Sequence, residues 1–207
     1  VRAHGIPPDR RARLGTLPLT LDDCTCPDVA KIQKLIRTQA RRGSHILIFG
    51  DPGHAEVTGL MGYAEGRGFV VNRPEDVAKL PELSPVCLVS QSTQLPDSYR
   101  RIADAVRERF PDALVLETIC QSTRNRQEEL VAMAARVDGF VVVGGMHSAN
   151  TVRLVELARS LKPTFHIETC EQLPRRELRE FKAVGLTAGA STPAFIIEEV
   201  KKALEDM

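Results

Sequence analysis

The chain contains one α/β unit twice, and this duplication constrains its fold more than any other feature. The segments that begin at Cys26 and Cys120 align without a gap at an offset of 94 residues. In each, a helical pattern leads to an apolar strand that ends in glycine, at 46–50 in one copy and 140–144 in the other. Strands that alternate with helices of ten or more residues form parallel sheets with right-handed crossovers. We therefore predict an α/β protein built from repeated small parallel-sheet domains.

The repeat also predicts how the chain is divided. We expect a remnant of a first α/β domain, then a second and a third α/β domain, at residues 1–25, 26–118 and 119–207, respectively. Within the remnant, the pattern predicts a strand end, a helix after two prolines and a second strand at 17–21. Because the opening residues resemble the end of a strand, we expect most of the first domain to precede Val1.

Composition excludes several classes of function. The net charge is +1, so no overall positive field favours nucleic acid or an anionic membrane surface. No apolar run approaches the ~20 residues that a membrane-spanning helix needs, and we expect neither a nucleic-acid nor a membrane partner. Five cysteines without the tight spacing of a small secreted scaffold favour a reduced, cytoplasmic setting.

Cysteines stand at equivalent points of the two repeats. A proline follows Cys26, which predicts that this cysteine caps a helix whose amide groups and dipole favour a thiolate. Thiolates bind metals and iron–sulfur clusters. One cysteine near a helix start is more often a small buried apolar residue, but Cys26 and Cys120 in matching places favour metal ligands. Cys24 is either a spare ligand or a buried neighbour, whereas Cys87 and Cys170 are predicted to be structural.

Polar side chains follow the predicted strands, where ligands bind in parallel sheets. His54 is suited to donate to a phosphate oxygen, and Glu56 to give or accept a proton, although a surface-loop histidine is an equal interpretation. The corresponding places elsewhere in the repeat hold neutral donors: Ser148, Asn150, Thr93 and Ser191. No Walker-type or dinucleotide glycine motif is present. The pattern therefore indicates a small anion held by histidine, hydroxyl and amide groups.

Seven motifs occur in the order that is typical of the LytB family, the 4-hydroxy-3-methylbut-2-enyl diphosphate reductases. The chain resembles that family over essentially its whole length, in the strings Ala3-His4-Gly5, Asp23-x-Thr25-Cys26-Pro27, Gly53-His54-x-Glu56-Val57-x-Gly59, Gln91-x-Thr93, Cys120-x-x-Thr123-x-x-Arg126-Gln127, Ser148-x-Asn150-Thr151-x-x-Leu154 and Thr187-Ala188-Gly189-Ala190-Ser191-x-Pro193.

The resemblance implies a pseudo-threefold set of three α/β domains around a central [4Fe–4S] cluster, with one cysteine ligand from each domain. It assigns two of these ligands to Cys26 and Cys120, the proton-relay acid to Glu56, and a place near the substrate hydroxyl to Thr93. The implied diphosphate contacts are His4, His54, Ser148, Asn150 and Ser191. The third ligand would belong to the first domain, which this chain is expected to lack.

The resemblance also implies the reaction and its partners. The substrate would be a small allylic diphosphate, and reduced ferredoxin or flavodoxin would supply two electrons that remove its hydroxyl group as water. The products would be isopentenyl and dimethylallyl diphosphate. Two alternatives stay open: an iron–sulfur lyase of the quinolinate synthase kind, and a truncated, non-catalytic paralogue that binds a phosphorylated ligand.

Overall fold

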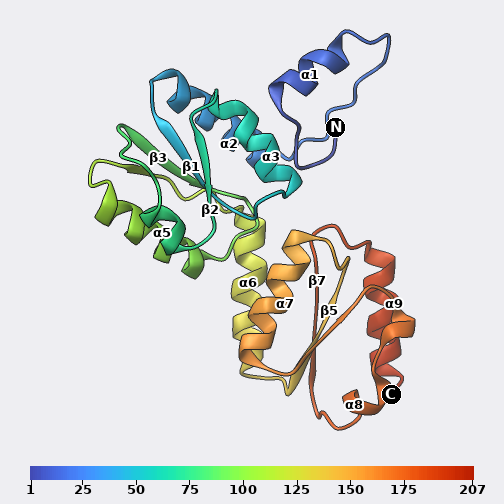
Figure 1. Ribbon diagram of the computed structural model, residues 1–207. Coiled ribbons are helices and arrows are strands. Elements are labelled where there is room, and N and C mark those ends of the chain that lie inside the picture. Colours follow the sequence, from blue (N-terminus) through green and yellow to red (C-terminus); the bar gives the residue numbers. More distant parts are fainter. The chain divides into compact units, whose positions relative to one another are not determined.

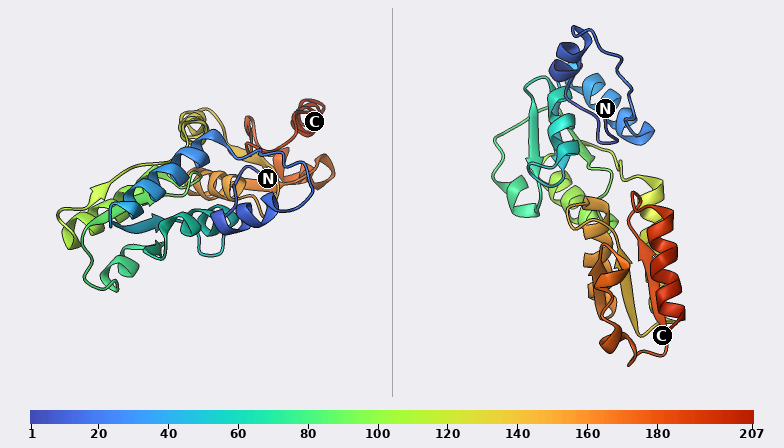
Figure 2. Two further views of the ribbon diagram at one scale, coloured as in Figure 1. Left: turned by 90° about the horizontal axis from the view of Figure 1, so that it is seen from above. Right: turned by 90° about the vertical axis from the view of Figure 1, so that its right-hand side faces the viewer.

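The computed structural model describes all residues from Val1 to Met207, and they divide into two compact units, Val1–Cys120 and Gln121–Met207 (Figure 1). Each unit taken by itself is a parallel sheet with helices on both of its faces, as the further views also show (Figure 2). The prediction of repeated α/β domains with parallel sheets is confirmed.

The first unit has a four-stranded sheet in the order β2-β1-β3-β4, and every neighbouring pair is parallel. Its elements are α1 (Pro8–Gly15), α2 (Pro27–Arg41), β1 (His45–Phe49), α3 (Ala55–Met61), η1 (Gly62–Ala64), β2 (Gly68–Val71), α4 (Pro74–Ala78), β3 (Val86–Ser90), α5 (Pro96–Arg109) and β4 (Leu114–Val115).

The central strand β1 is apolar throughout because both of its faces are covered. Ile46 and Ile48 pack with residues of α2, α3 and η1, whereas Leu47 and Phe49 pack with residues of α4 and α5. All four side chains are at most 1% exposed. Alternate residues of a strand point to opposite faces, so this single strand contributes to two separate cores.

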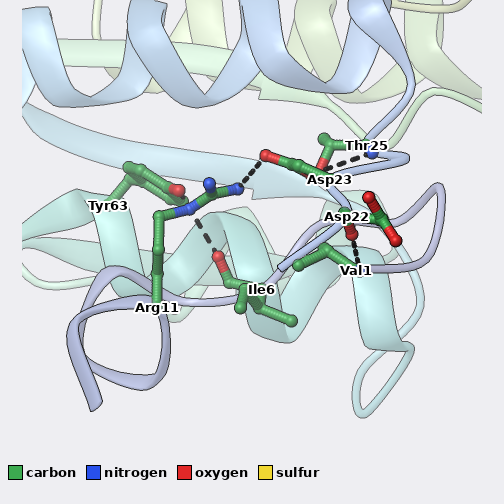
Figure 3. A network of polar contacts seen from close by, with 7 residues as sticks. All are labelled: Val1, Ile6, Arg11, Asp22, Asp23, Thr25 and Tyr63. Carbon is green, nitrogen blue, oxygen red and sulfur yellow. Dashed lines mark hydrogen bonds and ion pairs between the residues drawn. The ribbon is translucent and has the colours of Figure 1, made fainter. Parts of the chain in front are cut away.

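The first 25 residues are part of the first unit, and polar contacts join them to one another and to Tyr63 (Figure 3). Arg11 donates to the Asp23 carboxylate at 2.6 Å, and the backbone and hydroxyl of Thr25 donate to the same carboxylate at 3.0 and 2.6 Å. The Thr25 hydroxyl, followed by Arg11, holds the pKa of Asp23 at about 2. Tyr63 also donates to the backbone oxygen of Ile6 at 3.4 Å. The ionised Asp23 therefore joins α1 to the segment that leads into α2.

The predicted strand at 17–21 is wrong. Residues 17–19 form bends and 20–21 have no regular structure, and Leu17 and Leu19 are 49% and 60% exposed. Alternating leucines favour a strand, but a strand forms only where a neighbour supplies hydrogen bonds. Near this region, the hydrogen bonds between extended segments are made instead by the amides of Cys24 and Cys26, which donate to the backbone oxygens of Val1 and Ala3.

The second unit has a three-stranded parallel sheet in the order β6-β5-β7. Its elements are α6 (Gln121–Ala134), β5 (Gly139–Val143), α7 (Ala149–Leu161), β6 (Thr164–Ile167), η2 (Cys170–Gln172), α8 (Arg175–Leu178), β7 (Val184–Ala188) and α9 (Ala194–Glu205). This order matches β2-β1-β3 of the first unit, strand for strand. The duplication seen in the sequence is therefore also a duplication of topology.

The second unit repeats the two-sided core as well. Phe140 and Val142 of β5 pack with residues of α6 and α7, whereas Val141 and Val143 pack with residues of η2, α8 and α9. All four are fully buried. No helix is both long and apolar enough to cross a membrane.

Because each unit has its own core, we predict that core truncations act locally. Leu88→Ala in β3 and Leu154→Ala in α7 each remove a side chain that is at most 1% exposed. Each change should cost about 2–5 kcal/mol of unfolding free energy. Urea denaturation measures this loss. Hydrogen exchange with mass spectrometry, carried out on the folded proteins, should show faster amide exchange in the mutated unit alone. Equal loss of protection in both units would contradict independent cores.

Candidate active site

Glu56 is a buried carboxyl group at the start of α3. It is 1% exposed, and both of its oxygens accept hydrogen bonds from one residue in the loop after β3. The backbone N–H of Ser92 donates to Oε1 at 2.7 Å, and the Ser92 hydroxyl donates to Oε2 at 2.8 Å. The predicted acid is thus fixed between the ends of two neighbouring strands, β1 and β3.

Burial raises the pKa of Glu56 above its usual range, and the negative charge of Asp51 adds to this shift. The two hydrogen bonds from Ser92 act in the opposite direction, because they stabilise the carboxylate. Desolvation is the largest of these effects. Glu56 therefore keeps its proton to a higher pH than an exposed glutamate, which is the property that a general acid needs.

Ser92 also positions Cys120. The backbone oxygen of Ser92 accepts a hydrogen bond from the amide of Cys120 at 2.9 Å. One residue therefore holds the carboxyl group of Glu56 on one side and the backbone of a predicted metal ligand on the other. Sequence reasoning did not assign Ser92 a role, although its place between Gln91 and Thr93, directly after a buried strand, was a signal.

Cys26 and the thiol of Cys120 both lie beside the first turn of α2. Cys26 is the N-cap residue of this helix, and the thiol of Cys120 donates to Oδ2 of Asp28, the second helical residue, at 3.0 Å. Contact with Cys120, followed by Lys31, lowers the pKa of Asp28. Asp28 was not predicted from the sequence, because its partner lies 92 residues away.

Cys26 and Cys120 are the predicted ligands of a metal centre. Cys26, as the N-cap of α2, suits a thiolate ligand, because amide groups and the helix dipole favour negative sulfur there, whereas the Cys120 thiol donates to the Asp28 carboxylate. The structure contains no group of three or more histidine, cysteine, aspartate or glutamate side chains that could hold a metal ion. Cys26 and Cys120 therefore supply sulfur donors of the kind that an iron–sulfur cluster binds, but they do not form a metal site by themselves.

The two predicted diphosphate histidines of the first unit lie together. The rings of His4 and His54 meet edge to face with centroids 5.1 Å apart. Nδ1 of His54 accepts the backbone N–H of Glu56 at 3.2 Å and so caps α3. Neutral His54 must then carry its proton on Nε2, which makes that atom a donor. Burial, followed by the charge of Arg2, lowers the pKa of His4.

Thr93, the other predicted catalytic residue, follows Ser92 in the loop after β3. It is half-buried, and its hydroxyl oxygen accepts a hydrogen bond from Nε2 of Gln91 at 2.9 Å. Gln91 itself is fully buried. Both Glu56 and Thr93 are therefore held by side chains or amides of the same loop.

The second unit carries its predicted anion contacts at the corresponding ends of β5 and β7. The Ser148 hydroxyl caps α7 by accepting the backbone N–H of Thr151 at 3.5 Å. Oδ1 of Asn150 accepts from the Thr123 hydroxyl at 3.4 Å, while its Nδ2 atom is buried without a partner, as is the hydroxyl of Thr151. Ser191 is exposed in the loop between β7 and α9. Thr123 and Thr151 were quoted in the motifs but given no role.

The fold and these positions define a class of protein: duplicated parallel α/β units whose polar and thiol groups collect where strands end and helices begin. Residues 1–205 match the model of the family described as LytB protein. The chain belongs to the LytB family, and the predicted resemblance is confirmed. This assignment does not support the alternative of a lyase of the quinolinate synthase kind.

Relatives and solved structures agree with the family. The chain is 47% identical to 4-hydroxy-3-methylbut-2-enyl diphosphate reductase of Opitutus terrae, over 99% of this chain and 72% of that protein. It is 40% identical to the enzyme of that name in Alkaliphilus oremlandii, over 97% and 72%. The structure of the Plasmodium falciparum E-1-hydroxy-2-methyl-but-2-enyl-4-diphosphate reductase has a TM-score of 0.91 and 28% identity, with 97% of this chain and 64% of that chain covered. Because these relatives are named as reductases, the prediction that the chain belongs to an enzyme family of reductases is confirmed.

The burial of Glu56 predicts a pH-dependent stability. Its pKa in the folded state is raised, so its contribution to stability is fully present below the unfolded value of about 4.3 and is lost as pH rises through the folded pKa. Glu56→Gln has no such titration. The unfolding free energy of Glu56→Gln relative to the parent should therefore increase as pH rises above about 4.3, as measured by urea denaturation at a series of pH values. A difference independent of pH would contradict the raised pKa.

Proposed function

We propose that this chain carries out the binding and proton-transfer chemistry of 4-hydroxy-3-methylbut-2-enyl diphosphate reductase in isoprenoid biosynthesis. The observation that carries the proposal is the buried Glu56, whose partner Ser92 also holds the backbone of Cys120. A group that can release a proton is thereby connected to the backbone of a predicted cluster ligand. The names of the relatives supply the substrate and the type of reaction.

The overall reaction is a reductive dehydroxylation. An allylic alcohol, two electrons and two protons give an alkene and water, so that the C–O bond breaks and one C–H bond forms. The products would be isopentenyl and dimethylallyl diphosphate. Hydroxide is a poor leaving group, and protonation of its oxygen lowers the barrier to C–O cleavage. Glu56, with its raised pKa, is the residue that we assign to this protonation, and we assign to Thr93 a contact with the same hydroxyl group.

The diphosphate requires several donors with little water between them. His4 and His54 are half-buried and adjacent, and Nε2 of His54 is a donor when the ring is neutral. Ser148, Asn150 and Ser191 are the donors that we assign from the second unit. Neutral donors and amide groups at helix starts bind phosphate without a large positive field, which agrees with a net charge of only +1.

Cys26 and Cys120 are the residues that would hold a [4Fe–4S] cluster, together with a ligand that this chain does not supply. When bound, such a cluster supplies electrons one at a time and offers a Lewis-acidic iron atom. Reduced ferredoxin or flavodoxin is the electron donor that we expect. Within this chain, Cys26 is the N-cap residue of α2, the Cys120 thiol donates to Asp28 in the first turn of that helix, and the backbone oxygen of Ser92 accepts from the amide of Cys120.

The cluster assignment is tested with cysteine variants of the full-length protein. Cys26→Ser and Cys120→Ser should each lose most of the iron and the charge-transfer absorbance after anaerobic purification and reconstitution. Cys24→Ser is the matched control, because Cys24 is an exposed cysteine only two residues from Cys26. It should retain the cluster. Loss of iron in Cys24→Ser alone would show that the wrong cysteine of the pair has been assigned. A parent protein that takes up no iron would favour the non-catalytic paralogue.

The role of Glu56 is tested with Glu56→Gln. The amide oxygen of glutamine can accept from the Ser92 N–H, and its NH₂ group can donate to the Ser92 hydroxyl, so both contacts persist. We expect iron content and diphosphate binding close to the parent, and kcat lowered about 10²-fold to 10⁴-fold because no proton is available. Turnover with a reduced electron donor and calorimetric binding measure the two effects. Parent-like turnover would remove Glu56 from the acid role.

A further inference from the structure

Two side chains hold the β5–α7 loop of the second unit, residues 144–148, which ends in a predicted diphosphate contact. Nε2 of His166 lies 2.8 Å from the backbone oxygen of Gly144. Oε1 of Glu168 accepts the backbone N–H of Met146 at 2.8 Å. His166 belongs to β6, and Glu168 directly follows that strand. The backbone of the loop is therefore held at two points from one neighbouring strand.

The chemistry of the two contacts fixes their direction. A carbonyl oxygen only accepts, so Nε2 of His166 carries the proton and donates to Gly144. A backbone N–H only donates, so the Glu168 carboxylate is the acceptor for Met146, and a hydrogen bond to an ionised acceptor is stronger than one between neutral groups. Glu168 is itself held, because its backbone N–H donates to Oε1 of Gln172 at 2.6 Å.

Packing also confines the start of the loop. The φ of Gly144 is +148°, in the region that favours glycine. A Cβ atom at this position would lie 2.7 Å from the hydroxyl oxygens of both Thr151 and Thr192. The Thr192 hydroxyl in turn donates to the backbone oxygen of Val143 at 3.0 Å. The position of Gly144 is therefore set by packing, and its carbonyl group is bound by His166.

The first unit holds the corresponding loop from the opposite neighbour of its central strand. There the backbone N–H of Asp51 donates to Oε1 of Gln91, which follows β3, at 2.9 Å. By strand register, Val70 of β2 is the counterpart of His166, and valine has no polar group. In both units the N-cap residue donates its N–H to the residue three positions before it. The repeat thus keeps the turn and changes the side chains that hold it.

We propose that His166 and Glu168 are positioning residues for the diphosphate, which hold the β5–α7 loop in the shape that places Ser148 and Asn150. The inference rests on the proposed function, in which these two residues are donors to the diphosphate. Nδ2 of Asn150 is buried without a partner, and a phosphate oxygen would satisfy it. Donors that are already oriented lose less entropy when a ligand binds. The two side chains from β6 therefore act on affinity.

Glu168→Ala in the full-length, cluster-loaded protein removes one of the two contacts. Glu168→Gln is the rescue variant, because its amide oxygen accepts from Met146 as the carboxylate does. We expect the Kd for inorganic diphosphate and the KM for the substrate to rise about tenfold in Glu168→Ala. In Glu168→Gln both should rise less than about threefold, and kcat should change less than about threefold in both variants. Calorimetry and steady-state kinetics measure these effects.

His166→Leu and His166→Gln form the corresponding pair for the second contact, because leucine has no donor and glutamine retains one. The same contrast in Kd and KM is expected. Glu180→Ala is the matched control for the loss of a negative charge, since Glu180 is an exposed glutamate of the same unit. It should bind diphosphate as the parent does.

A double-mutant cycle distinguishes positioning from a general loss of structure. In a background that carries Ser148→Ala and Asn150→Ala, Glu168→Ala should change the Kd less than about threefold, because the groups that it positions are gone. In a His4→Ala background, which removes a predicted contact of the first unit, Glu168→Ala should keep its full effect. Melting temperatures of all variants report folding separately.

The outcomes separate this inference from the proposed function. Parent-like Kd and KM in both Glu168→Ala and His166→Leu would overturn the inference and leave the function intact. A loss that Glu168→Gln does not rescue would also overturn it, as would a full loss without Ser148 and Asn150. A parent that shows the predicted weakening of diphosphate binding in Glu168→Ala, but does not reduce the substrate, would support the inference and defeat the proposed function. A parent that binds no diphosphate would defeat both.

Discussion

The contact between Glu56 and Ser92 is the interaction on which the rest of the site depends. A carboxyl group that is 1% exposed needs partners for both of its oxygens, and a single serine supplies them through its amide and its hydroxyl. The same serine holds the amide of Cys120. Burial raises the pKa of Glu56, while the two donors keep the carboxyl group in one orientation. Acidity and geometry are therefore set by one pair of residues.

The duplicated fold uses one structural position for two kinds of chemistry. His54 and Ser148 both cap the helix that follows the central strand of their unit, through Nδ1 and through the hydroxyl oxygen. Two residues later, Glu56 and Asn150 both lie buried in the first turn. The backbone geometry is preserved because each helix start needs a cap. The side chain two residues beyond is free to differ, and it is an acid in one unit and an amide in the other.

Much of this arrangement follows from sequence, because strand ends and helix starts are local features. The periodicity located the strands, and motif positions directly after them identified Glu56 and Thr93 as candidates. Contacts such as Asp28 with Cys120 and Gln91 with Asp51 were missed because they depend on tertiary pairing over long separations. The prediction of a strand at 17–21 was wrong for the same reason. Alternating leucines favour a strand, but a strand forms only where a neighbouring strand supplies hydrogen bonds to its backbone.

Cys120 begins the second repeat in sequence, yet it ends the first unit in the structure. Its amide is held by Ser92 and its thiol by Asp28, and both of these residues belong to Val1–Cys120. Cys26 caps α2, the helix that contains Asp28. Both cysteines therefore belong to the first compact unit, and the contacts of Cys120 described above are with residues of that unit. The structural boundary falls just after the second cysteine, so the duplicated sequence places both predicted ligands in one compact unit.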